Sequence, residues 1–489
     1  MPWRVGIVTL FTLLLWPGIC LASGNSSHAE EHLSLSGYSL PFQIFAILPF
    51  VALLLSIAIL PLVAEHFWHS NLNRGIVAGA FSVIIIALLY YLEQQGQPGM
   101  HALAEGLEEY GAFICLLGSL YVVSGGIVFD MNVKPTPLVN GAILVFGAVI
   151  ANLIGTTGSS MLLIRPFLRI NQSRSKVAHL PIFFIFMVSN LGGLLTPLGD
   201  PPLFLGFLDG ISFFWTFSLW KQWLFANGMV LGVFLVWDTI AYLRDPNNKS
   251  TNSTPLAGPR LSVSGLVNLL FFAGILAAVL CQSYDPAEFI HGYLPNFPVS
   301  KLVFPGPEIL MIAMALLSLY FTKRGLRKKN GFGWGAIIEV AVLFIGIFIT
   351  MVPALAILKD NGEDFQRAGL NQPWHYFWLT GLLSGFLDNA PTYKTFASLK
   401  AAGSKDLSGL MTETTAGFPE GIFLAAISCG AVFMGAMTYI GNGPNFMVKA
   451  ISDEQGYKTP SFFGYLGYSA CILGPIFVII TIVFFLNPT

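Results

Sequence analysis

The stretch NLGGLLTPLGDPP, residues 190–202, interrupts an apolar run that starts near residue 179 and otherwise resembles a membrane helix. Its glycines and prolines break helical hydrogen bonding, and it places the carboxylate of Asp200 among apolar neighbours. Backbone groups left unpaired at membrane depth are tolerated only where protein or a water-filled cavity surrounds them. We therefore expect a broken transmembrane helix here, with its break facing a polar cavity.

The rest of the chain has the composition of an all-α polytopic membrane protein. Of its 489 residues, 55% are hydrophobic and 10% are charged, whereas a soluble domain carries about 25% charged residues. The net charge of −1 argues against nucleic acid as a partner. Apolar runs near the length of a membrane-spanning helix occur at about 41–64, 75–92, 110–130, 138–154, 179–198, 203–218, 222–243, 263–282, 307–322, 335–357, 374–387, 418–440 and 462–486.

A second copy of the break motif indicates an internal repeat. Residues 437–442, MTYIGN, match residues 195–200, LTPLGD, and Asp388-Asn389 matches Ala151-Asn152 in the same order. Each upstream match ends an apolar helix and opens a short polar stretch, which predicts a re-entrant helical hairpin in each half. We expect each repeat to consist of one hairpin and one broken helix.

The placement of Lys and Arg predicts that the repeats are inverted. The basic cluster at 323–329 should be cytoplasmic, and the acidic loops 93–109 and 283–306 should be external. Under this assignment the first spans of the two repeats, 110–130 and 335–357, run in opposite directions. Inverted repeats with broken helices point to a central site and to alternating access.

The beginning of the chain resembles a secretory signal peptide, because Arg4 precedes an apolar run that ends before Ala22. The alternative is an uncleaved first helix. Cleavage would leave a periplasmic mature N-terminus in a cell inner membrane. The expected organisation is a signal peptide at 1–22, a periplasmic tail at 23–40, N-terminal scaffold helices at 41–104, a first transport repeat at 105–245, scaffold helices with the basic loop at 246–334, and an inverted second transport repeat at 335–489.

Asp200 and Asp388 are the candidate ion-binding and proton-exchanging residues. A carboxylate at the centre of a membrane helix costs about 2.5–3.5 kcal/mol on insertion scales, so it is rare there without a function. Such a group can bind a proton or Na⁺, but not both at once. The structural alternative is that either aspartate caps a half-helix or, for Asp388, pairs with Lys394. The candidate coordinating side chains are Asn152, Thr156, Thr157, Asn190, Thr196, Asn389, Thr392, Thr438 and Asn442.

Three further ionisable residues are candidate charge partners. Lys394 follows the second hairpin motif, and Arg165 lies within the first hairpin, where it can pair with Asp200 or extend to the cytoplasm. Glu339 opens its span near the basic cluster, so an interfacial position is the alternative. We expect no cofactor, because Na⁺ and H⁺ would be the transported ions.

Residues 190–202 and the stretch SGFLDNAPT at 384–392 resemble motifs of the ion transporter superfamily. This superfamily includes NhaD-type sodium/proton antiporters, arsenite permeases and the melanosomal P protein, with citrate and dicarboxylate carriers more distant. The resemblance implies a homodimer in which each protomer has a scaffold and a moving transport domain. The chain departs from many relatives by having Ala151 where they carry an aspartate.

The leading hypothesis is a Na⁺/H⁺ antiporter that exports Na⁺ or Li⁺ in exchange for external protons. The rival is a Na⁺-coupled citrate or dicarboxylate symporter, or an arsenite-type oxyanion permease. The rival needs positive charge at its site, for which Lys394 and Arg165 are the nearby cations in sequence. A channel or receptor is a third reading, against which the inverted repeats argue. An enzyme is disfavoured, because the chain shows no P-loop, nucleophile elbow or clustered metal ligands.

Overall fold

The computed structural model describes residues 33–486 apart from 69, 247–260, 284–305, 368, 403, 405 and 416. The expected signal peptide and most of the tail lie outside these residues. The fold is an all-α polytopic membrane protein, as predicted. Seven helices of the described part are long and apolar enough to cross a membrane. Their segments are Leu40–Pro61, Asn71–Gln94, Gly99–Ser124, Pro137–Ile170, Trp215–Leu243, Ile337–Arg367 and Phe462–Leu486.

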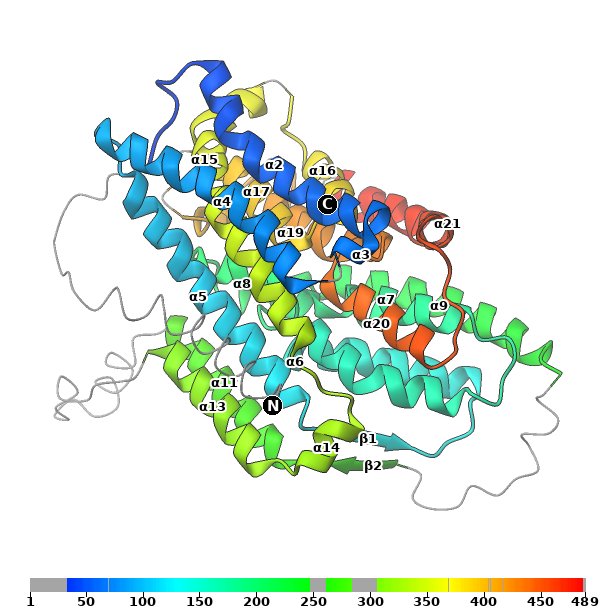
Figure 1. The fold of residues 1–489 in the computed structure, drawn as a ribbon. Helices are drawn as coiled ribbons and strands as arrows, with labels where there is room; N and C mark the ends of the chain where they lie inside the picture. Colours follow the sequence, from blue (N-terminus) through cyan, green and yellow to red (C-terminus); the bar gives the residue numbers. More distant parts are fainter. Residues whose placement is uncertain are drawn as a thin grey trace, which may run out of the picture.

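The helices form two groups that lie side by side (Figure 1). In the first group, α15 packs against α2, α4 and α5, and α5 also packs against α11 and α13. Each of these helices is a single uninterrupted element. The bounds of this group are α2 Leu40–Val63, α4 Asn71–Gln94, α5 Gly99–Ser124, α11 Val267–Ser283, α13 Pro307–Phe321 and α15 Gly335–Arg367.

The second group contains the interrupted elements. α6, Pro137–Ile170, is one element by hydrogen bonding but bends back at Gly155, where φ is 78° and ψ is 155°. The Ser159 hydroxyl donates to the Gly147 carbonyl oxygen at 2.8 Å, although these residues are twelve apart in the chain. In a straight helix twelve residues span about 18 Å, so the two arms of α6 fold against each other. This confirms the hairpin predicted at 138–170.

The second half repeats these parts in the same order. A hairpin of two helices is followed by a broken helix and then by a long helix, which packs against its counterpart from the first half. The direction of each half across the membrane stays a prediction. The first-half elements after α6 are α7 His179–Met187, the 3₁₀ turn η1 Leu191–Leu195, α8 Pro201–Leu208 and α9 Trp220–Leu243. The second-half elements are α16 Pro373–Phe386, α17 Asn389–Lys400, α19 Ile422–Met434, the 3₁₀ turn η4 Gly435–Met437, α20 Gly443–Glu454 and α21 Phe462–Ile480, which continues as the π-helix η5 Thr481–Leu486.

Short elements complete the described part of the chain. The sequence predicted no strands, but an antiparallel pair forms, with Val128 opposite Ser264 and Met131 opposite Leu261. This pair ties the start of the first hairpin to the chain before α11. The short elements are α3 Glu65–Trp68, β1 Val128–Met131, the 3₁₀ turn η2 Trp215–Leu219, β2 Leu261–Ser264, α14 Arg324–Lys329 and α18 Gly409–Thr412.

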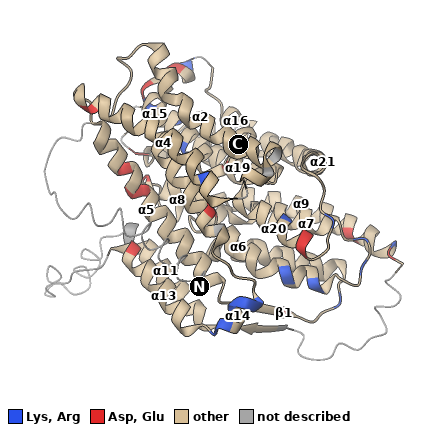
Figure 2. Ribbon diagram, in the orientation of Figure 1, with Lys and Arg blue, Asp and Glu red and all other residues tan. Residues whose placement is uncertain are grey.

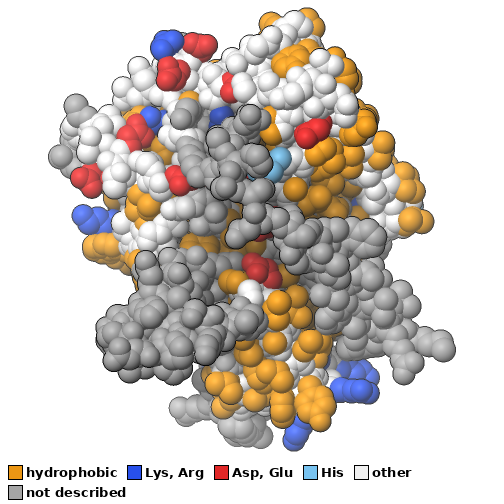
Figure 3. Space-filling view, turned by 90° about the vertical axis from the view of Figure 1, so that its left-hand side faces the viewer, with side chains coloured by type: hydrophobic (Ala, Val, Ile, Leu, Met, Phe, Trp, Pro, Cys, Tyr) orange, Lys and Arg blue, Asp and Glu red, His pale blue; other side chains and the backbone are white. Residues whose placement is uncertain are grey.

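Lys and Arg residues gather around α14 and the neighbouring end of α6, as Figure 2 shows. Figure 3 views the left-hand side of Figure 1, where hydrophobic side chains lie between Lys and Arg at the lower edge and acidic side chains above. Lys394 and Lys400 follow the second hairpin motif on the expected external side, where the rule for Lys and Arg would not place them. Lys394 is buried and Lys400 is half-buried, and both lie next to carboxylates, Lys400 contacting Glu413. Their charges are therefore balanced inside the protein and do not argue against the predicted orientation.

We expect Gly155→Ala to destabilise the protein. The backbone at this bend lies in a region that only glycine adopts readily, and a Cβ there would meet the Leu198 carbonyl oxygen at 3.3 Å. Holding another residue in such a conformation costs about 1–3 kcal/mol. Thermal unfolding in detergent measures the change. Gly228→Ala on α9, where a Cβ would meet nothing within 4 Å, is the control and should keep or raise the midpoint.

Candidate functional site

Asp200 lies where the broken helix of the first half meets elements of the second half. It is the N-cap of α8 and only 1% exposed. One carboxylate oxygen accepts from the Thr156 hydroxyl at 2.8 Å and from the Asn442 amide at 3.1 Å, and the other accepts from the Asn389 amide at 2.5 Å. These three donors come from the first hairpin, the second break and the second hairpin. Asp200 therefore connects all four interrupted elements.

A layer of side-chain amides supports Asn442. Its amide also donates to the Asn190 side-chain oxygen at 3.2 Å, and Asn190 donates to the side-chain oxygen of Asn445 at 2.7 Å. The Asn445 amide in turn donates to the carbonyl oxygens of Gly435 at 2.8 Å and Thr438 at 2.9 Å. These bonds pair the backbone groups that the second break leaves open. They also link the two breaks directly, so neither can shift without the other.

Glycines let each break fold back on itself. A Cβ at Gly199 would lie 2.2 Å from the carbonyl oxygen of Gly193, and a Cβ at Gly441 would lie 2.6 Å from that of Gly435. Both pairs are six residues apart and occupy matching places in the two halves. The chain thus needs glycine at these positions because the backbone approaches itself too closely for any side chain. The same six-residue spacing of glycines occurs in both halves because both breaks fold back in this way.

A cavity of about 370 Å³ opens beside Asp200. Four half-helices begin at its wall: the second arm of α6 after Gly155, α8 after Asp200, α17 after Asp388, and α20 after Asn442. Thr157 also lines this cavity. Helix N-termini carry partial positive charge, so they attract anions. Pro201 and Pro202 supply no N–H at the start of α8, and the N–H groups of Thr156 and Ala390 are already bonded, so the attraction comes mainly from the helix dipoles. The cavity therefore combines the buried carboxylate of Asp200 with helix ends that favour negative charge.

Asp388 contributes to the wall of this cavity but not to the Asp200 network. Its carboxylate accepts from the backbone N–H of Ala390 at 3.1 Å and so caps α17. It is partly exposed, unlike Asp200. Both the capping role and the ion-binding role considered from the sequence are compatible with this position.

Arg74 is a residue of the cavity wall that the sequence analysis missed. It lies in the first turn of α4 and forms an ion pair with Glu339 of α15 at 2.9 Å. Of the described residues that line the cavity, Arg74 is the only lysine or arginine. Its place at the beginning of an apolar run made it resemble an interfacial residue. The run of Asn71, Asn73 and Arg74 before the span was the available signal.

Several predicted coordinating residues stabilise the breaks rather than face Asp200. The Thr196 hydroxyl contacts the Asn152 carbonyl oxygen, and the Thr438 hydroxyl donates to the Gly385 carbonyl oxygen at 2.6 Å. The Asn152 side-chain oxygen accepts from the N–H of Leu195 at 2.8 Å. The Thr392 hydroxyl donates to the Asp388 carbonyl oxygen within its own helix. Of the predicted set, the structure brings together Asp200, Thr156, Asn190, Asn389 and Asn442.

Two of the expected charge partners lie away from Asp200 and Asp388. Lys394 does not pair with Asp388, because its ammonium group contacts Glu109 of α5 and lies 3.2 Å from Asp209. These carboxylates come from the end of α8 and from the first helix group, which a local sequence pattern could not reveal. Arg165 does not pair with Asp200. It donates to the Asn330 carbonyl oxygen at 3.0 Å, at the basic end of the molecule. This agrees with the alternative that Arg165 extends toward the cytoplasmic side.

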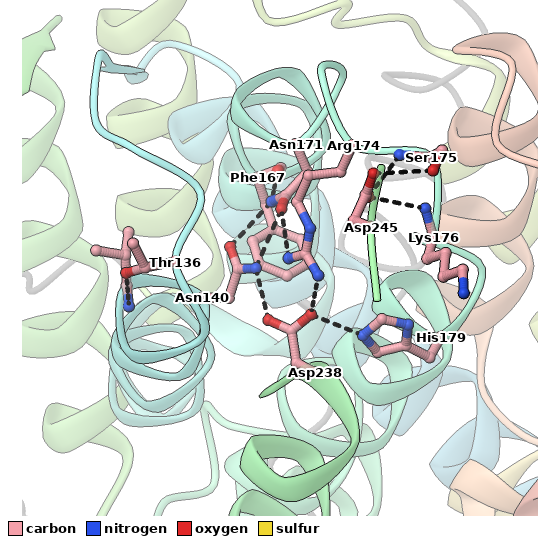
Figure 4. A network of polar contacts seen from close by, with 11 residues as sticks. Thr136, Asn140, Phe167, Asn171, Arg174, Ser175, Lys176, His179, Asp238 and Asp245 are labelled. Carbon is pink, nitrogen blue, oxygen red and sulfur yellow. Dashed lines mark hydrogen bonds and ion pairs between the residues drawn. The ribbon is translucent and has the colours of Figure 1, made fainter. Parts of the chain in front are cut away.

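Asp238 of α9 is the centre of a second buried network (Figure 4). It accepts from Arg174 at 2.6 Å, from His179 at 2.9 Å and from the Asn140 amide at 2.9 Å. Asn140 and Asn171 also exchange hydrogen bonds between the two arms of α6. The network thus joins both ends of the first hairpin to α7 and α9. It lies outside the cavity, so we assign it to holding the first half together.

The comparison with known families concerns nearly the whole chain. Residues 39–485 match the family described as "Putative citrate transport". No curated protein matches the chain. The matched region contains both hairpins, both breaks, Asp200 and Arg74.

Proposed function

The chain belongs to this citrate-transport family, within the ion transporter superfamily, and on that premise we propose that it carries a citrate-class carboxylate across the membrane together with Na⁺ or H⁺. This is the alternative that the sequence left second to Na⁺/H⁺ antiport. We place the protein, by the same proposal, in the inner membrane with a periplasmic mature N-terminus.

One observation carries the proposal: four half-helix N-termini and the guanidinium group of Arg74 share the wall of the cavity. A di- or tricarboxylate has several negative groups at fixed spacing. Helix N-termini and the guanidinium group of arginine both bind such groups. The partial positive charge at the helix ends stabilises one carboxylate, and arginine forms two parallel hydrogen bonds to another. A binding site for Na⁺ and H⁺ alone needs no positive side chain to hold its ligand.

Electrostatics explains why a coupled cation is needed. The described residues that line the cavity include the carboxylates of Asp200, Asp388 and Glu339, against the single positive charge of Arg74. A carboxylate substrate would be repelled unless Na⁺ or H⁺ offset part of this charge. The buried side-chain oxygen of Asn389 has no hydrogen-bond partner within the described part of the chain. Together with Asp200 it offers oxygen ligands for a small cation.

Na⁺/H⁺ antiport remains the second candidate. Asp200 is buried, and the hydrogen bonds described for it come from neutral donors, so it can alternate between a proton and Na⁺ without displacing an ion pair. The same site would serve a symporter through cation binding alone. Only the transported solute distinguishes the two functions.

Reconstitution into proteoliposomes tests the proposal. We expect uptake of labelled citrate under an inward Na⁺ or H⁺ gradient, above that of protein-free vesicles, with succinate and arsenite compared in parallel. A dye for internal pH reports Na⁺-driven proton movement in the absence of any carboxylate. Proton movement without citrate uptake would replace the proposal by antiport, and arsenite uptake alone would replace it by an oxyanion permease.

A further inference from the structure

We propose, as an extension of the proposed carboxylate transport, that Arg74 binds one carboxylate of the substrate and that Glu339 is the internal carboxylate which the substrate displaces from it. Glu339 then takes up a proton, which couples carboxylate binding to proton binding.

The guanidinium group of Arg74 is held in position by contacts with neighbouring side chains. One terminal nitrogen lies 2.9 Å from Glu339, and the other donates to the side-chain oxygen of Asn71 at 2.6 Å. Its ring neighbour is Trp68, with the guanidinium carbon 6.0 Å from the ring centroid. Only 9% of the side chain is exposed. The guanidinium group is therefore fixed in position by three different residues.

One donor of Arg74 is left open. Within the described part of the chain, its Nε atom is buried and has no hydrogen-bond partner. An unpaired buried donor on a charged group costs free energy, so it marks a place where a ligand would restore the missing bond. A carboxylate is the ligand that matches the paired N–H groups of an arginine. The side chain lies in the wall of the cavity that also holds Asp200.

The position of Arg74 within the cavity sets the class of substrate. Arg74 comes from α4 in the first helix group, whereas the half-helix N-termini come from the second group. A ligand that engages both needs at least two carboxylates, one for each wall. We therefore expect dicarboxylates and tricarboxylates to bind well, and monocarboxylates such as acetate to bind poorly.

Glu339 connects binding at Arg74 to protons. It lies on α15, its side chain is 33% exposed, and it lines the cavity. When a substrate carboxylate takes its place on Arg74, Glu339 loses this ion pair. A carboxylate whose ion pair is broken among apolar residues is costly, and a proton neutralises it. The proton comes from the surrounding water and is released when the substrate leaves and Arg74 pairs with Glu339 again.

The other ionisable groups around Glu339 belong to the elements that pack against α15. α4 supplies Arg74, and α17 begins after Asp388. α5 supplies Tyr110, whose hydroxyl donates to the carbonyl oxygen of Ala341 at 3.0 Å, and Glu109, which pairs with Lys394. Asp200, at the start of α8, lines the same cavity. α2 carries no Asp, Glu, Lys or Arg. Two tyrosines also line the cavity. The hydroxyl of Tyr121 donates to the Gly333 carbonyl oxygen at 2.6 Å and that of Tyr439 to the Pro460 carbonyl oxygen at 3.1 Å. Among the described residues that line the cavity, Arg74 is the only lysine or arginine, so a substrate bound to it changes the charge next to Glu339.

The test uses the full-length purified protein and four variants of the pair: Arg74→Lys, Arg74→Gln, Glu339→Gln and the double variant Arg74→Gln/Glu339→Gln. Citrate affinity is measured by calorimetry, and the protons bound per citrate are obtained from buffers of different ionisation enthalpy. Arg367→Gln and Glu363→Gln are matched controls, because these residues form an ion pair at 2.7 Å on the exposed end of the same helix α15.

We expect Arg74→Gln to weaken citrate binding roughly 100-fold and Arg74→Lys, which keeps the charge without the planar fork, roughly 10-fold. Glu339→Gln should bind citrate at least as tightly as the wild type, and take up about one proton fewer per citrate. The double variant should remain weak, which shows that the loss does not come from an unpaired Glu339. Both controls should match the wild type.

Each outcome is decisive. Absence of carboxylate binding and uptake in the wild-type protein would overturn the proposed function, and this inference with it. Citrate uptake that persists in Arg74→Gln and in the double variant would overturn the role of Arg74 but leave carboxylate transport standing. An unchanged proton count in Glu339→Gln would overturn the coupling role of Glu339.

Discussion

Asp200→Asn is expected to reduce cation-coupled citrate uptake by at least about 100-fold, equivalent to ~2.7 kcal/mol. The substitution keeps the shape of the side chain but removes its charge. Thr156, Asn389 and Asn442 all donate to Asp200, so an amide at this position presents N–H groups to at least one donor. The cation then loses its charged ligand, and the four interrupted elements lose a shared acceptor. Initial uptake rates in proteoliposomes measure the effect.

Asp453→Asn is the control for this experiment. Asp453 also lies on a half-helix, near the end of α20, but it is exposed and pairs with Lys449 at 2.8 Å. Uptake should stay within about twofold of the wild type, because an exposed ion pair contributes little. If Asp200→Asn transported citrate at the wild-type rate with the same dependence on Na⁺ or H⁺, Asp200 would not be a coupling residue.

Asp238→Ala is expected to lower the stability of the protein by about 3–5 kcal/mol, because it removes one partner of a buried ion pair. Arg174 would keep its charge with only 3% of its side chain exposed, and His179 and Asn140 would lose their acceptor. Thermal unfolding in detergent should show a much lower midpoint. Expression in the membrane should fall as well.

Two further variants separate charge from packing in this network. Asp130→Ala removes a carboxylate that pairs with Arg169 and Lys329 at the surface, and it should cost less than about 1 kcal/mol. The double variant Asp238→Asn/Arg174→Gln removes both buried charges and should recover part of the stability. A midpoint unchanged in Asp238→Ala would mean that the network does not hold the first half together.

The fold followed from local patterns in the chain. Apolar runs marked the helices, because their length must match the membrane and their backbone bonds close within each segment. Ala151-Asn152 and Asp388-Asn389 marked the hairpins, and the stretches around Asp200 and Asn442 marked the breaks. The two-stranded pair at Val128 and Ser264 escaped notice, since it forms between segments far apart in sequence.

The assignment of function depended on a cation that the sequence appeared to lack. Lys394 and Arg165 were the basic residues nearest to the motifs, and the structure pairs both with other groups. Arg74 lies more than a hundred residues before either break, on a helix with no motif. Its approach to the cavity depends on how α4 packs against α15. Sequence distance therefore disguised the residue that most favours a carboxylate substrate.

The sequence by itself determined the class of protein, the repeated hairpins and breaks, and the central place of Asp200, because each of these is a local property of the chain. Helical breaks need glycine and proline where they occur, and a carboxylate in an apolar run is rare unless it has a function. Only the tertiary structure decided which polar residues meet. The hydrogen-bond donors Thr156, Asn389 and Asn442 lie 44, 189 and 242 positions from Asp200, and the ion pair joins Arg74 to Glu339 of a distant helix. Such contacts depend on packing between whole helices, which no single stretch of the chain encodes.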